Sequence, residues 1–195
     1  VLIIAIALGG GSAKKTVNGY MKAIQNCDNE KAQSYQAFDY KNYYIDYYSE
    51  ENIEDLMDSG DSWMADYDDV EEVYDELEDE YDDYSGTIKS GKDVYAAMVE
   101  ESNEALKDDE IEEFEITDVK DIDISKDVIE ESIERYEDFC DNSDLDGKKY
   151  FNGKKVKKAK KVTVKYKDED GSGKVYFYVV KYGSDWKIID MEYDY

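Results

Sequence analysis

Oxygen-bearing side chains near residue 144 could bind calcium. Asn142, Asp144 and Asp146 stand at alternate positions before Gly147, as ligands do in the first half of a calcium-binding loop. The pattern is incomplete because the first position is Asn and the twelfth is Gly153 instead of a bidentate Glu. We therefore favour a polar loop between a helix and a sheet, with calcium at Asn142, Asp144 and Asp146 as the alternative.

The two cysteines, Cys27 and Cys140, could form a disulfide. Each is expected near the end of a helix, and an exported protein meets an oxidising environment. A bond between them would close a long loop and could contribute on the order of 4 kcal/mol to stability. The sequence does not establish that the two residues lie within bonding distance, so two free thiols are the alternative.

The chain has no histidine, which removes the usual general base near neutral pH, the commonest zinc ligand and the Ser-His type of triad. A buried aspartate beside a tyrosine could still transfer protons if burial raised its pKa. With 51 acidic residues and 20 tyrosines, no single Asp/Tyr pair stands out. The sequence therefore predicts no catalytic residue, and no cofactor except the calcium alternative.

Charge divides the chain into two parts. Residues 1–147 carry a net charge of −33, whereas residues 148–195 carry +6. The total of −27 argues against nucleic acid or an anionic membrane surface as the main partner. The lysines within residues 154–161 are expected to pair with the protein's own acidic half, with anionic wall polymers as the alternative.

Composition alone leaves folding undecided. Leu, Ile, Val and Phe make up 40 of the 195 residues, which is close to the boundary below which strongly charged chains stay disordered. The tyrosines add apolar surface that the aliphatic residues lack, so a tyrosine-rich core is expected. Five of them fall in residues 40–48, where we favour rings at the edge of a core over an aromatic binding platform.

The first twelve residues differ from the rest of the chain. Residues 1–8 are all apolar, and a Gly-Gly-Gly-Ser spacer follows at residues 9–12. An apolar segment needs roughly twenty residues to span a bilayer, so this one is too short. We interpret residues 1–12 as the remnant of an export signal or anchor, with a buried first strand or helix as the alternative. The interpretation predicts a secreted or membrane-anchored, extracytoplasmic protein.

Residues 13–147 are predicted to be mainly helical. A first helix of about 15 residues begins at Ala13, and Asp28 can cap a short second helix. The strongest periodicity lies in residues 61–84, where aromatic and aliphatic residues alternate steps of four and three. This pattern predicts one amphipathic helix over that range.

The rest of the acidic half combines helices with one strand. Helical spacing is present in residues 92–106, and near alternation in residues 112–124 predicts a bulged strand. Ser125 is expected to cap a further helix.

The basic end is predicted to be a β-meander. Three apolar runs at residues 156–166, 175–182 and 186–193 are separated by turn-forming residues, including Gly171 and Gly183. We expect these runs to form consecutive antiparallel strands.

The order of these segments resembles a known family. The segments TVNGYMKAIQNCDNEKAQSY, ELEDEYDDYSG, EFEITDVKDIDIS and KVYFYVVKYGSDWKIIDM are similar to those of exported Gram-positive proteins of unknown function. Those proteins are often lipid-anchored and contain a nuclear transport factor 2-like, cystatin-like domain. The resemblance covers residues 13–195. It implies a curved antiparallel sheet wrapped around helices, as a cone with a pocket at its open end, and it carries over no catalytic motif.

Together these observations predict a single α+β domain over residues 13–195, with N-terminal helices packed on a curved antiparallel C-terminal sheet. The expected function is non-catalytic binding of a protein, a wall polymer or a small ligand at the cell surface; a homodimer is left open. Nucleic acid is not an expected partner, and a membrane is contacted only through an N-terminal anchor. The alternatives are a small-pocket enzyme with a buried Asp/Tyr pair and an envelope protein that responds to divalent cations.

Overall fold

Helices fill the first part of the chain and strands its last part. The computed structural model describes residues 11–60, 62–108, 111–141, 145–169 and 171–194, so most of the predicted export remnant lies outside the described residues. The helices are α1 (Gly11–Gln25), α2 (Asn29–Gln33), α3 (Tyr40–Tyr47), α4 (Glu50–Ser59), η1 (Trp63–Asp66), α5 (Val70–Glu80), α6 (Gly91–Asp108), α7 (Asp127–Asp141), η2 (Gly147–Lys149) and η3 (Gly153–Lys155). The strands are β1 (Glu113–Ile122), β2 (Val156–Asp168), β3 (Gly171–Tyr182) and β4 (Asp185–Asp194).

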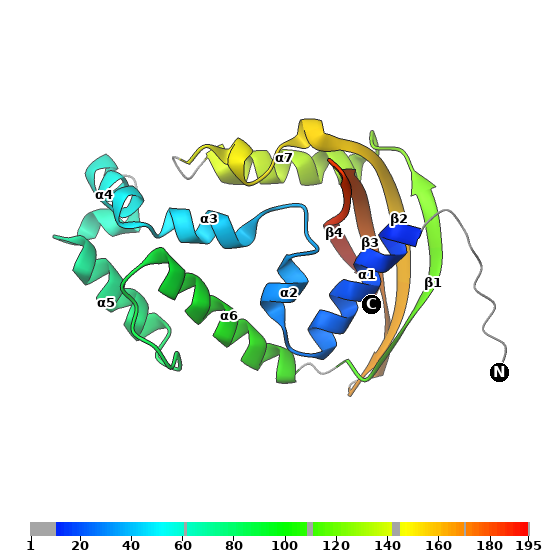
Figure 1. The fold of residues 1–195 in the computed structure, drawn as a ribbon, viewed down its shortest axis with the longest axis horizontal. Helices are drawn as coiled ribbons and strands as arrows, with labels where there is room; N and C mark the ends of the chain where they lie inside the picture. Colours follow the sequence, from blue (N-terminus) through cyan, green and yellow to red (C-terminus); the bar gives the residue numbers. More distant parts are fainter. Residues whose placement is uncertain (1–10, 61, 109–110, 142–144, 170, 195) are drawn as a thin grey trace.

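The strands form one antiparallel sheet in the order β1-β2-β3-β4. The sheet is curved and does not close into a barrel (Figure 1). The predicted meander is confirmed, and Gly183 makes its second turn at a φ of 60°, a conformation that strains residues with a Cβ. The predicted bulge in β1 is confirmed by a register shift between Ile116 and Asp118. The fold is therefore α+β, as predicted.

α1 lies inside the curve of the sheet (Figure 1). Val17 and Met21 on its buried face pack with Phe177 of β3 in one apolar cluster. The hydroxyl of Thr16 donates a hydrogen bond to the carbonyl of Trp186 at 3.0 Å, which ties the helix to β4. The first helix and its apolar face are thus confirmed, although α1 begins two residues before the predicted start.

A second apolar cluster covers the other face of the sheet. It joins Ile129 of α7 and Tyr43 of α3 to Val180 and Ile189 of the sheet. Because helices cover both faces here, the neighbouring residues Val179 and Val180 are both fully buried. This double cover explains the unbroken apolar run in β3.

The third apolar cluster lies away from the sheet, in residues 50–108, which we call the helical lobe. Its core includes Ile53 of α4, Val73 and Leu77 of α5, and Val94 of α6. Figure 1 shows α3 and α6 extending from the region of α4 and α5 toward the sheet. Tyr47 of α3 packs against both the second and the third cluster, so it links the two parts.

The single helix predicted for residues 61–84 is wrong. Trp63–Asp66 form the short 3₁₀ helix η1, and the backbone is extended at Tyr67 before α5 begins. The side chain of Asp69 accepts from the amide of Glu72 at 3.1 Å, while the Glu72 carboxylate accepts at 2.9 Å from the residue before Asp69. This reciprocal capping starts a new helix in the middle of the periodic pattern.

Other helix boundaries also differ from the prediction. Tyr40–Tyr47 form α3, with Tyr48 as its C-cap. Tyr43 is buried, which confirms rings at a core edge but with helical spacing. α4 was not predicted. Ser125 does not cap α7, because its hydroxyl donates to Asp123 at 2.9 Å and the helix begins at Asp127.

The free edge of β4 is covered by the segment that links α2 to α3. The amide of Ala37 donates to the carbonyl of Ile188 at 2.7 Å, and the amide of Ile188 donates to the carbonyl of Tyr35 at 2.8 Å. Gln36 therefore pairs in parallel with β4 as an isolated bridge. The arrangement protects a sheet edge that would otherwise be open to pairing with another chain.

Candidate functional site

The predicted calcium loop lies mostly outside the described residues, which omit Asn142 and Asp144. Asp146 is exposed and caps η2, where its Oδ1 accepts from the amide of Lys148 at 3.3 Å. Among the described residues, no group of three or more metal-ligating side chains is arranged to hold an ion. Calcium at Asn142, Asp144 and Asp146 remains a prediction.

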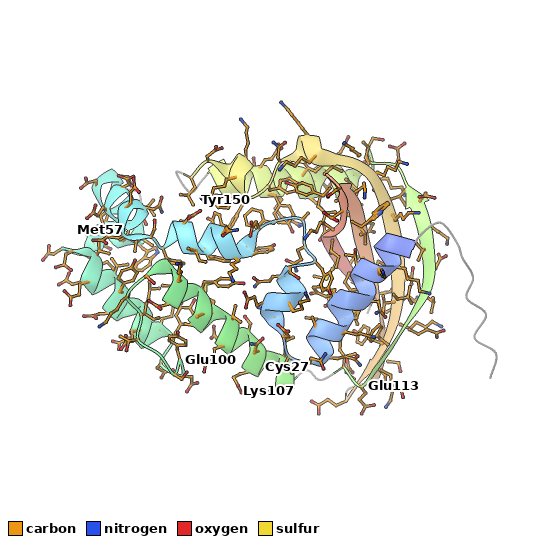
Figure 2. All side chains as sticks on the ribbon, viewed as in Figure 1. Cys27, Met57, Glu100, Lys107, Glu113 and Tyr150 are labelled. Carbon is orange, nitrogen blue, oxygen red and sulfur yellow. The ribbon has the colours of Figure 1, made fainter. Side chains whose placement is uncertain are left out.

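The predicted disulfide also remains a prediction. Cys27 is half-buried just past the end of α1, at a φ of 51°, and carries a free thiol. The side chain of Cys140, in α7, is outside the described ones. Figure 2 shows Cys27 beside Lys107 at the end of α6, on the opposite side of the view from α7.

Self-pairing of the lysines in residues 154–161 is largely wrong. Within the described part of the chain, the only ion pair of these six lysines joins Lys160 to Asp121 of β1 at 2.7 Å. Lys161 instead lies 3.7 Å from the ring centroid of Tyr176. The pairing with the acidic half comes from β1, which lies next to β2, and no described residue of the helical lobe forms an ion pair with these lysines.

A hollow of about 460 Å³ lies between α1 and the concave face of the sheet. We call it the α1 hollow. Its apolar lining includes Met21 and Ile24 of α1 and Val175 and Phe177 of β3. The edge of the Tyr20 ring packs against Phe177 with centroids 5.5 Å apart. The helix is therefore held against the sheet, and the hollow lies alongside this contact.

The polar groups of the α1 hollow are one carboxylate and three tyrosine hydroxyls. Asp168 is half-buried, and its Oδ1 accepts from the amide of Gly171 at 3.0 Å in the β2–β3 turn. Tyr166 and Tyr193 meet edge to face, 6.4 Å apart, and Tyr193 is 50% exposed. Burial, with a smaller contribution from Tyr193, raises the pKa of the Tyr20 hydroxyl well above its usual range. Tyr20 is therefore neutral at physiological pH, and its hydroxyl is hydrogen-bonded to Gln36, which does not line the α1 hollow.

This composition suits binding. An apolar wall with a few polar groups at its edge is the common form of a small-molecule site, and 460 Å³ is within the usual range of volumes. Proton transfer would depend on Asp168 and the neighbouring Tyr166, which also line the α1 hollow. No histidine is available to assist them.

An acidic hollow of about 410 Å³ lies between the end of α5 and α6 in the helical lobe. Glu80, Asp82 and Glu100 are among its lining carboxylates, and Figure 2 places Glu100 on α6. Hydrogen bonding here is sparse, since the hydroxyl of Ser85 reaches Glu100 only at 3.4 Å.

The sequence did not indicate the residues of the α1 hollow. Alternation in β3 placed Val175 and Phe177 on one face, but it did not show that α1 leaves space beside them. The available signal was the position of Asp168, which ends the strand β2 with its alternating apolar residues and precedes the turn to β3.

No helix among the described residues is both long enough and apolar enough to cross a bilayer. Comparison with protein-family models, with curated proteins and with solved structures gave no match to this chain. Its helices packed on an antiparallel sheet are compatible with the nuclear transport factor 2-like or cystatin-like fold.

Proposed function

We propose that this chain is a non-catalytic, extracytoplasmic binding domain whose ligand site is the α1 hollow. The observation that carries the proposal is the space of about 460 Å³ between α1 and the sheet, lined by apolar side chains. A ligand there would be small and largely apolar, because burial of apolar surface is the main attraction that such walls offer. A ligand could enter the α1 hollow from solvent beside Tyr193, which lines the hollow and is 50% exposed.

Export belongs to the same proposal and has separate support. The apolar run in residues 1–8 is typical of an export signal or anchor, and residues 13–195 resemble exported Gram-positive proteins with a nuclear transport factor 2-like domain. A protein or wall polymer at the cell surface would then be the alternative to a small ligand.

Titration with the neutral fluorophore N-phenyl-1-naphthylamine tests the site. Ile24→Trp adds bulk inside the α1 hollow and is expected to weaken binding of the fluorophore at least about tenfold. Ile124→Trp is the matched control, because Ile124 is 40% exposed and is not part of the lining. Thermal unfolding checks that both variants fold. Equal fluorophore binding by the wild type and Ile24→Trp would contradict the proposal.

The rival function is a small-pocket enzyme, which is favoured only by the presence of Asp168 beside Tyr166 in the α1 hollow. The Asp168→Asn substitution distinguishes the two functions. A binding domain keeps its affinity for the neutral fluorophore and shows no turnover of a neutral ester such as p-nitrophenyl acetate. Turnover that Asp168→Asn abolishes would favour the enzyme.

A further inference from the structure

A second hollow, of about 430 Å³, lies where the α2–α3 link meets the end of the sheet. It shares no lining residue with the α1 hollow. Its walls come from Glu30, Gln33 and Ser34, from residues 36–41, from Tyr95 of α6, from Lys149, Tyr150 and Lys155, and from Tyr182 and Lys187 of the sheet. We call it the lysine hollow, because four lysines line it.

Aromatic rings form much of the wall of the lysine hollow, and their hydroxyls are held by the protein. Tyr95 donates to Gln33 at 2.9 Å, Tyr150 donates to Asp46 at 2.7 Å, and Tyr182 accepts from the amide of Asn152 at 2.8 Å. These hydrogen bonds fix the rings in place. A planar group in the hollow would meet preformed aromatic surface.

Two of the four lysines are neutralised by carboxylates. Lys41 pairs with Glu30, and Lys149 pairs with Asp46, each at 2.5 Å. They contribute little net charge to the lysine hollow.

The other two lysines form no ion pair with any described residue. Lys187 donates to the neutral carbonyl of Ser34, and Lys155 lies 5.5 Å from the ring centroid of Tyr182. Two acids also line the hollow: Glu30, which pairs with Lys41, and Asp39, whose oxygens accept from the backbone and side-chain amides of Asn42 at the start of α3. Lys155 and Lys187 therefore bring two lysines without an ion-pair partner to one hollow. With the carboxylates of Glu30, Asp39 and Asp46 counted against the four lysines, one excess positive charge remains.

Unpaired cations are unexpected in a chain with 51 acidic residues and a net charge of −27. Of these 51 acidic residues, 23 lie in the helical lobe. In the chain segment that contains Lys155, the lysines Lys154, Lys157 and Lys158 also form no ion pair within the described residues. This local field would attract anions even though the whole chain repels them.

We propose that the lysine hollow binds a phosphate monoester attached to a ring. A phosphate monoester carries between one and two negative charges near neutral pH, and Lys155 and Lys187 are two lysines without an ion-pair partner that could bind it. Charge-assisted hydrogen bonds from Lys155 and Lys187 would hold the phosphate, and the tyrosine rings would pack against the ring. The volume of about 430 Å³ accommodates a ligand of that size.

Titration of the full chain with phenyl phosphate, followed by calorimetry or NMR, tests this inference. Lys155→Gln and Lys187→Gln are each expected to weaken binding about tenfold, the loss typical of one charge-assisted hydrogen bond. Lys158→Gln is the matched control, because this exposed lysine of β2 does not line the hollow. Phenol, which has the ring without the phosphate, is expected not to bind measurably.

Two results would overturn the inference: no binding of phenyl phosphate to the wild type, or an equal loss in Lys158→Gln, which would indicate diffuse attraction by the basic surface. Circular dichroism checks the fold of each variant. Binding of N-phenyl-1-naphthylamine in the α1 hollow is expected to be unchanged by Lys155→Gln, so the two sites can fail or succeed independently.

Discussion

The sheet with its covering helices and the helical lobe are built by different physical means. The sheet is buried on both faces, and its clusters share strands, so α1, α3 and α7 are held by one scaffold. The helical lobe packs a single cluster of its own. It also carries 23 acidic residues against three lysines in residues 50–108, a net charge of −20.

This difference indicates where stability and binding are concentrated. Both hollows with features suited to a ligand adjoin the sheet, where rigid strands fix the position of the lining residues. In the helical lobe, like charges on exposed helix faces repel each other, so its few buried residues must hold it together. We expect the helical lobe to open more readily than the sheet.

The largest expected effect comes from replacing a large buried side chain with alanine in each of the two regions. Phe177→Ala removes a fully buried ring between α1 and the sheet and should lower the free energy of unfolding by about 3–5 kcal/mol. Leu77→Ala should lower it by about 2–5 kcal/mol within the helical lobe. Urea denaturation measures both losses.

Hydrogen exchange sharpens the same comparison. Leu77→Ala is expected to speed amide exchange in α4, α5 and α6 while leaving β2 and β3 protected, since local opening releases the less stable part first. Uniform acceleration across the sheet would show instead that the two regions unfold as one unit.

Salt should affect the two regions unequally. Raising sodium chloride from a low concentration to 0.5 M screens the repulsion between carboxylates in the helical lobe. We expect this screening to raise the free energy of opening of the lobe by on the order of 1 kcal/mol. Amide hydrogen exchange in α5 measures the change. Calcium chloride at matched ionic strength is expected to give the same gain. A larger gain with calcium would support the cation-responsive alternative.

The smallest expected effect concerns the contact between α3 and residues 149–150. Burial alone would raise the pKa of Asp46, but hydrogen bonds from Lys149 and Tyr150 outweigh it and lower the pKa below its ordinary value of 3.8. A lowered pKa in the folded state means that the stabilisation is present at neutral pH and is lost as the pH falls below 3.8. Asp46→Asn should therefore cost about 0.5–1 kcal/mol at pH 7 and progressively less in acid.

Thermal unfolding at several pH values measures the Asp46→Asn effect. Asp55→Asn, at an exposed position of α4, is the control and should change stability little at any pH. An effect of Asp46→Asn that stayed constant down to pH 3 would rule out the ionised carboxylate as its cause.

Much of the sheet could be predicted because its signals are local. Turn residues such as Gly183 separate apolar runs of strand length, and the uneven alternation in residues 112–124 indicated the bulge in β1. α1 was also predictable, since Val17 and Met21 lie on one helical face and both are buried.

The helical lobe was harder to predict because aspartate is abundant there. Almost any of its aspartates could cap a helix, so the sequence did not single out Asp69 as the residue that starts α5. Trp63 continued the apolar spacing yet is 42% exposed outside that helix. The two hollows were not predictable either, because each lies between segments that are distant in the sequence. The α1 hollow, for example, lies between Ile24 of α1 and Val175 of β3.

The most direct test of the central claim is a crystal structure of the full chain with N-phenyl-1-naphthylamine bound. The account predicts that the fluorophore lies in the α1 hollow, in contact with Met21, Val175 and Phe177. A fluorophore seated elsewhere, for example between α5 and α6, or an α1 hollow filled by its own side chains, would contradict it.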